Sequence, residues 1–298
     1  MRKILVGTDL SAQAEQAVAH AMDLGRRHGV EVVLALATAV PDSPAGVDPS
    51  TAEAADLYLR SLNKRLADDR EQLATLRQHW VGQGVTVSTT VVDGYADEVL
   101  PRVAEEVGAD LIVVGTHGRT GLRRAFLGSV AERTTRLAGC DVLVVRGDRA
   151  PSGGYRHVVV GVDFSEHADR AIERALTQLA APGARVDLVY CWQIPPLSIS
   201  PDMPFSAVHY EQLAQGAQAQ LGERYAAAAA RGVAAGLDVR LHAVQRPASQ
   251  GLEDWARDHG ADLIVTGSHG RRGLRRWVLG SVAEVTIRHA PCSVLVVR

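Results

Sequence analysis

The sequence predicts two tandem doubly wound α/β domains, each built around a five-stranded parallel sheet. The chain has 298 residues, which is long for one domain and natural for two. Residues 115–146 and 267–298 align without a gap and are identical at 23 of 32 positions. A repeat period close to half the chain length indicates two copies of one domain, because solenoids repeat in much shorter units.

In the first half, the predicted strands are short runs rich in valine and isoleucine, which suit a sheet covered on both faces. They are residues 3–7, 31–37, 85–92, 110–115 and 141–146. Between them, longer alanine-rich segments predict helices at residues 11–28, 52–79, 95–107 and 129–138. Strands that alternate with helices require right-handed crossovers, and the sheet is therefore predicted to be parallel.

The second half repeats this order. Its predicted strands are residues 157–162, 185–191, 237–244, 262–267 and 293–298. Its predicted helices are residues 166–180, 206–231, 248–259 and 281–290. The stretch 147–155 is rich in glycine, proline and serine, which predicts a linker between a domain at 1–146 and a second domain at 156–298.

Composition and charge argue against several classes of protein. The formal net charge is −2, which is not typical of a nucleic-acid or membrane-surface binder. No apolar run approaches the length needed to cross a bilayer, and the apolar stretch near the N-terminus is too short for a signal peptide. The three cysteines are too few and too scattered for a disulfide framework. These features predict a cytoplasmic protein.

A glycine pattern that occurs once in each half predicts a phosphate-binding loop. Each copy has Gly-x-x-Gly, nine residues and Gly-Ser: Gly115, Gly118, Gly128 and Ser129 in the first half, then Gly267, Gly270, Gly280 and Ser281 in the second. Glycines let a backbone turn tightly and approach a phosphate, and a helix N-terminus favours an anion. Alternatively, the glycines only make turns and the serines only cap their helices. The repetition of the full spacing favours the phosphate site.

Charged residues near these loops are further candidates. Asp9 and Asp163 follow the first predicted strand of each half and should project into the same crevice. A carboxylate repels phosphate, and a base amino group, a ribose hydroxyl or a metal ion is therefore the expected contact. A role as helix N-cap is the alternative, although a serine two residues later competes for it. Arg119 and Arg271 suit either phosphate oxygens or a solvated surface.

Several catalytic motifs are missing from the sequence. Lys3 and Lys64 are the only lysines, and neither lies near a glycine loop, which excludes a P-loop of the G-x-x-x-x-G-K-[ST] kind. There is no G-x-S-x-G elbow and no repeated Ser/His/Asp or Cys/His set. His117 and His269 have no second ligand at metal-binding spacing. No catalytic residue and no metal ligand is therefore assigned, and the pattern predicts a place to hold a nucleotide.

The glycine pattern, with ADLIVVG before it and VLVVR after it, resembles the universal stress proteins in the tandem two-domain form of their ATP-binding branch. The segments GTDLS and GVDFS match the family's first-strand acidic motif, and the resemblance covers essentially the whole chain. It implies Rossmann-like domains of the adenine nucleotide alpha hydrolase type, with ATP bound at the carboxyl ends of the strands.

The resemblance also implies roles for individual residues. Asp9 and Asp163 would face the adenine or ribose, and the backbone around Ala37 and Tyr190–Cys191 would meet the adenine edge. The glycines and serines of the loops would hold ribose and phosphates, with Mg²⁺ bound through the phosphates. The family pairs domains through the fifth strand, here 142–146 and 294–298, either in a homo-oligomer or within one chain.

One departure from the family pattern follows the third strand, where the first half has Gly94 and the second has Arg246. Two ATP sites are predicted, and the first matches the family pattern more fully. The predicted function is an ATP-binding stress-response and signalling protein with an unidentified protein partner. The alternatives are a slow ATPase or phosphotransferase that uses the same pocket, and a nucleotide-free dimerising scaffold.

Overall fold

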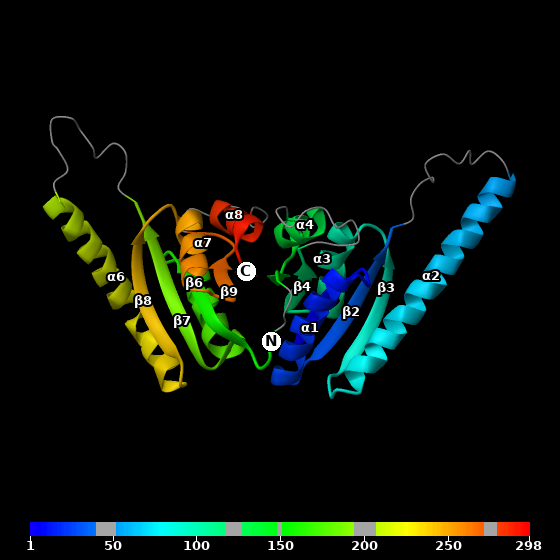
Figure 1. Ribbon diagram of the computed structural model, residues 1–298, viewed down its shortest axis with the longest axis horizontal. Helices are drawn as coiled ribbons and strands as arrows, with labels where there is room; N and C mark the ends of the chain where they lie inside the picture. The colour runs from blue at the N-terminus through cyan, green and yellow to red at the C-terminus, as the bar shows by residue number, and fades with distance from the viewer. Residues whose placement is uncertain (40–51, 117–126, 148–150, 194–206, 271–278) are drawn as a thin grey trace.

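The computed structural model describes residues 1–39, 52–116, 127–147, 151–193, 207–270 and 279–298. Its two halves lie side by side, with the long helices α2 (Ala52–Val81) and α6 (Ala207–Ala234) at opposite outer ends (Figure 1). Strands and helices alternate along each half, and the predicted fold class is confirmed. Within the described residues, no helix is long and apolar enough to cross a membrane.

In the first half, every predicted element is present, and its bounds shift by only a few residues. The elements besides α2 are β1 (Lys3–Thr8), α1 (Ala12–His28), β2 (Glu31–Thr38), β3 (Val87–Asp93), α3 (Ala96–Val107), β4 (Leu111–Gly115), α4 (Ser129–Leu137) and β5 (Asp141–Val145). The five strands pair in parallel in the order β3-β2-β1-β4-β5. The order reverses beside β1, which is where such sheets open a crevice for a ligand.

The second half repeats this topology. Its elements besides α6 are β6 (Tyr155–Val162), α5 (Glu166–Arg174), the π-helical turn η1 (Ala175–Leu179), β7 (Ala180–Trp192), β8 (Asp238–Gln245), α7 (Ala248–Asp258), β9 (Leu263–Gly267), α8 (Ser281–His289) and β10 (Ser293–Val297). The helix predicted for 166–180 ends instead in η1, and β7 begins five residues earlier than predicted. Gly183, which has a φ of 74°, lies in the added segment.

The predicted linker is also one residue too long at its end. Tyr155 is the first residue of β6 and is only 1% exposed. Its hydroxyl is hydrogen-bonded to Nδ1 of His20 in α1, at 2.8 Å. The aromatic ring is held by a contact with the other half of the chain, which local composition does not reveal.

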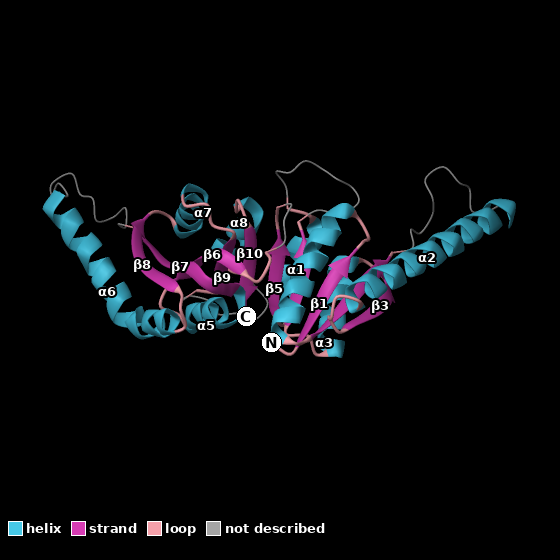
Figure 2. Cartoon of the chain, turned by 60° about the horizontal axis from the view of Figure 1, so that its bottom comes forward, coloured by secondary structure: helices cyan, strands magenta, loops and turns pink. Residues whose placement is uncertain are grey.

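The two halves form one ten-stranded sheet, because β5 and β10 pair antiparallel at its centre (Figure 2). Helices α1, α2, α5 and α6 pack on one face of this sheet, and α3, α4, α7 and α8 pack on the other. Successive strand residues alternate between the two apolar cores, as Ile4 and Leu5 do in β1. Both faces are therefore buried, which explains the near-continuous apolar runs in the strands.

On one face of the sheet, further hydrogen bonds join the two halves. The guanidinium group of Arg27 in α1 donates to the carbonyls of Leu179 (3.3 Å) and Ala180 (3.0 Å). His28 donates from Nε2 to the carbonyl of Gln178 at 2.9 Å. The C-terminal end of α1 is thereby docked on η1 and the start of β7.

A buried carboxylate distinguishes the second half from the first. The side chain of Asp187 in β7 is fully buried, whereas Val33 occupies the equivalent place in β2. Its four hydrogen-bond donors are Arg185 (2.9 Å), Trp255 (2.9 Å), His157 (3.0 Å) and His242 (3.3 Å). Burial alone would raise the pKa of Asp187, but these hydrogen bonds together outweigh burial and lower it.

We expect Asp187→Asn to lower the free energy of unfolding by about 3–5 kcal/mol at pH 7, because it leaves the partly buried guanidinium group of Arg185 without its charged partner. Since the pKa of Asp187 lies below its ordinary value of 3.8 in the folded chain, this contribution is complete above about pH 5 and declines as the pH falls further. Urea denaturation between pH 3 and pH 7 measures both effects. The control Asp238→Asn removes only an exposed carboxylate and should scarcely change stability.

Candidate functional site

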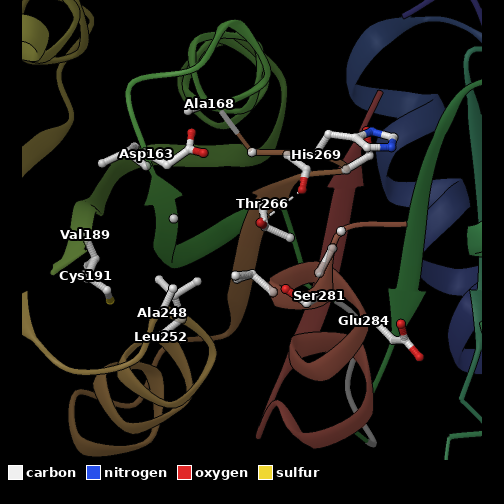
Figure 3. A pocket seen from close by; sticks show the side chains of 18 of the residues that line it. Asp163, Ala168, Val189, Cys191, Ala248, Leu252, Thr266, His269, Ser281 and Glu284 are labelled. Carbon is white, nitrogen blue, oxygen red and sulfur yellow. Dashed lines mark hydrogen bonds between the residues drawn. The ribbon is translucent and has the colours of Figure 1, made fainter. Parts of the chain in front are cut away.

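A cleft of about 920 Å³ opens at the carboxyl ends of β6, β7 and β9 in the second half (Figure 3). Its lining includes Asp163, Tyr190, Cys191, Gly267, Gly270 and Ser281. Figure 3 shows Asp163 on one side of the cleft, with Ser281 and Glu284 of α8 on the other. A cleft of this size is large enough for a nucleotide-sized ligand. In the first half, Gly118 and Arg119 lie outside the described residues, as does Arg271 in the second.

The glycine loop of the second half is closed by backbone hydrogen bonds. At its start, the amide of Ser268 donates to the carbonyl of Val297 at 2.7 Å, which ties the loop to the end of β10. At its end, the amide of Gly280 donates to the carbonyl of Ser268 at 2.8 Å. Thr116, Val145 and Gly128 make the same two contacts in the first half. Both loops therefore leave and return at one point beside the fifth strand.

The close approach of this loop to Asp163 favours glycine at position 270. A Cβ atom built at Gly270 would lie 2.6 Å from Oδ2 of Asp163, and one built at Gly267 would lie 2.7 Å from Cβ of His167. Distances this short are not tolerated between non-bonded atoms. The structure thus brings together the acidic residue and the loop that the sequence predicted separately.

The serines that follow the loops are the first residues of their helices. Helix α8 begins at Ser281 with Gly280 as its N-cap, and α4 begins at Ser129 with Gly128 as its N-cap. The alternative that these serines merely cap their helices is therefore wrong. Amides in the first turn of a helix have no carbonyl partner within it, and they favour a bound anion.

Asp163 and Asp9 are not helix caps either. Oδ1 of Asp163 accepts hydrogen bonds from the amide (3.1 Å) and the hydroxyl (2.5 Å) of Ser165. Ser165 is the true N-cap of α5, since its hydroxyl oxygen accepts from the amide of Ala168. Asp9 and Ser11 repeat this arrangement at α1, with distances of 3.0 and 2.6 Å. Each serine fixes one oxygen of its aspartate, and in Asp163 the other oxygen lies on the side of Gly270.

The residue after each aspartate has an unusual backbone conformation that the sequence did not reveal. Leu10 has a φ of 63° and Phe164 a φ of 66°, in the left-handed region that large side chains seldom adopt. The amide of Leu10 donates to the hydroxyl of Thr8 (3.1 Å), and the amide of Phe164 donates to the hydroxyl of Tyr225 (3.0 Å). Such local strain gathers at binding sites, where the surrounding structure holds it in place.

Where the first half has Gly94, the second half has Arg246 without the positive φ, and two neighbouring side chains also differ. Gly94 has a φ of 125°, and a Cβ atom there would lie 2.9 Å from Cγ1 of Val99. The second half has Arg246 and Gly251 at these two positions, and Cys191 in place of Ala37. A Cβ atom at Gly251 would lie 3.0 Å from Cβ of Arg246 and 2.6 Å from Sγ of Cys191. The larger residues fill the space that Val99 fills in the first half.

The end of β7 supplies the remaining side of the cleft. Tyr190 lines it and packs against Phe164, with the ring centroids 4.5 Å apart and the ring planes tilted by 53°. Burial raises the pKa of the Cys191 thiol to about 12, which keeps it protonated and unreactive at neutral pH. In the first half, Ala37 lies at the equivalent end of β2, paired with Val92 of β3.

Two histidines lie beside the glycine loop. The rings of His167 and His269 are 5.5 Å apart, and Nδ1 of His269 is hydrogen-bonded to the hydroxyl of Ser268. Burial lowers the pKa of His167, and the charges of Arg170 and His269 lower it further. His167 was missed by the sequence reasoning, because the first half has Gln13 in its place. Among the described residues, no cluster of three or more His, Cys, Asp or Glu side chains could hold a metal ion.

Comparison with known proteins agrees with this architecture. The family model Usp, described as the universal stress protein family, matches residues 1–146 and 154–298. The chain therefore belongs to the universal stress protein family, as the resemblance of its motifs implied. The two matched segments correspond to the two halves of the sheet.

Individual relatives show the same relationship. A universal stress protein of Mycolicibacterium smegmatis is 30% identical over 301 residues, which cover 99% of this chain and 96% of the relative. One of Mycobacterium tuberculosis is 34% identical over 192 residues, which cover 64% of this chain and only 62% of the relative's own length. The crystal structure of a universal stress protein from Archaeoglobus fulgidus shares the fold over 99% of this chain and 96% of its own, at 21% identity and a TM-score of 0.69.

We expect Gly251→Val alone to destabilise the second half by about 1–3 kcal/mol, because the added atoms overlap Cys191 and Arg246. Combining it with Cys191→Ala and Arg246→Gly recreates the first-half set of side chains and should restore most of that loss. Urea denaturation of the single and triple variants measures the recovery. A triple variant no more stable than Gly251→Val would contradict the inference that these three side chains change together.

Proposed function

We propose that the chain is a cytoplasmic ATP-binding stress-response and signalling protein, with one nucleotide at each glycine loop. One observation carries this proposal: the approach of Gly270 to Asp163 beside the N-terminus of α8, within a cleft of about 920 Å³. A helix N-terminus suits a phosphate group, and a carboxylate suits the ribose or base, which carries hydroxyl or amino donors. The cleft supports both in one place.

The two ends of the proposed ligand would contact opposite sides of the cleft. Its phosphates would lie at the amides around Gly280 and Ser281, where glycine gives the backbone room to approach. Its ribose and base would lie toward Asp163 and the end of β7 at Tyr190. Mg²⁺ would neutralise phosphate charge and bind chiefly through phosphate oxygens, since the described residues offer no cage of protein ligands.

The side chains that line the cleft favour holding over hydrolysis. Glu284 is ion-paired with Arg136 (3.5 Å) and Arg288 (3.7 Å), which disfavours a role as general base. Asp163 is hydrogen-bonded through Oδ1 to Ser165 and lies on the ribose side of the proposed ligand. Nucleotide retention, rather than turnover, would then be the signal that a protein partner recognises.

The first test is to denature freshly purified protein and identify any released nucleotide by chromatography and mass. ATP in amounts matching both loops supports the proposal. ADP, with measurable turnover of added Mg-ATP, would replace it with the slow ATPase. Absence of nucleotide, and of binding to added Mg-ATP, would replace it with a nucleotide-free scaffold.

We expect Gly270→Ala to abolish about one of two binding equivalents for Mg-ATP, because the methyl group displaces either the loop or the carboxylate of Asp163. Isothermal titration gives the stoichiometry. The matched control is Gly222→Ala in α6, where an added Cβ meets no atom within 4 Å and alanine favours the helix. Unchanged stoichiometry in Gly270→Ala would remove this loop from the proposed site.

A further inference from the structure

Two arginines cross the boundary between the halves at the centre of the sheet. Arg146 follows β5 and donates from Nη2 to the carbonyls of Ile287 and Arg288, both at 3.2 Å. Arg298 follows β10 and donates from Nη2 to the carbonyl of Arg136 at 3.1 Å and to that of Thr135. The two arginines are equivalent in the repeat, and so are their acceptors. The contact is therefore made twice, once in each direction.

The acceptors belong to the last turns of α8 and α4. Carbonyls in the last turn of a helix have no amide partner within it, and a cation there also complements the helix dipole. Both arginine side chains are partly buried, with the guanidinium groups fixed by these carbonyls. Each thus acts as a C-terminal cap supplied by the opposite half of the chain.

The capped helices are the ones whose first turns face the glycine loops. Helix α8 runs only from Ser281 to His289, and a shift at its end is therefore transmitted to its start. Ion pairs between Arg136 and Glu284 (3.5 Å) and between Arg288 and Glu132 (3.4 Å) tie the same two helices together. The position of each anion-binding helix start depends on groups from both halves.

We propose that Arg146 and Arg298 are positioning residues for the nucleotide site of the opposite domain. Arg146 holds α8 and thereby the second site, while Arg298 holds α4 and thereby the first. The identity of the ligand rests on the proposed function, but the holding of each helix does not. Each site is incomplete without the other domain.

The binding test uses Mg-ATP and chains in which one site is blocked. Ser129→Glu and Ser281→Glu each place a carboxylate where phosphate would lie, while glutamate in the first turn favours the helix. With the first site blocked, Arg146→Gln should weaken binding at the second site about fivefold, the size expected for a partly buried cation at a helix C-terminus. With the second site blocked, Arg146→Gln should leave binding at the first site unchanged.

Arg298→Gln should give the reverse pattern, weakening the first site and sparing the second. A general loss of stability would weaken both sites in both variants, and the crossed pattern therefore separates positioning from misfolding. Arg146→Lys should recover part of the affinity, since it keeps the charge but lacks the planar guanidinium that contacts two carbonyls.

Hydrogen exchange without nucleotide tests the holding of the helices directly. Arg146→Gln should speed exchange in α8 and leave α4 unchanged, and Arg298→Gln should do the opposite. Equal exchange in variant and wild type, or equal loss at both helices, would overturn the proposal. A crossed exchange pattern with unchanged affinities would overturn its claim about binding. A wild-type chain that binds no Mg-ATP would overturn the proposed function, while exchange would still decide whether the arginines hold the helices.

Discussion

The antiparallel pairing of β5 with β10 is the interaction on which the rest of the structure depends. Each strand would otherwise be an apolar sheet edge with unpaired amides and carbonyls, which is a template for aggregation. Their register is symmetric about the pair Leu143 and Leu295, so that two parallel sheets become one. The same pairing brings α4 beside α8 and places Arg146 and Arg298 within reach of the opposite helices.

Side chains that differ between the two halves change in a coordinated way around the glycine loops. The strained amide after the aspartate is satisfied by Thr8 in one half and by Tyr225 in the other. In the first half the bulky Val99 lies next to Gly94, whereas in the second half Gly251 lies next to Arg246. In both cases a contact made by one residue in the first half is made by a different residue in the second.

Much of the fold was predictable from sequence, because strands such as 142–145 are continuous apolar runs and glycines mark their ends. The location of Asp163 and Gly270 at one edge of the sheet was also predictable, since topology brings the carboxyl ends of parallel strands together there. Other features depend on contacts between distant segments. Tyr155 was assigned to the linker because its partner, His20, lies in another domain. The left-handed conformation of Phe164 has no local sequence signal, and the donors around Asp187 come from three strands and a helix.

Joining the two domains in one chain allows the two halves to differ in sequence. Covalent linkage keeps the partner strand at a high effective concentration, so that the pairing of β5 with β10 does not depend on protein concentration. The two copies are then free to diverge, as Asp187 and Arg246 show, provided that the shared junction is kept. In the paired strands, residues 142–146 and 294–298 are identical, Arg146 and Arg298 among them, whereas the outer strands β3 and β8 differ in sequence. Along the sheet, the two halves are therefore identical in the segment through which each completes the other, and different at the outer edges.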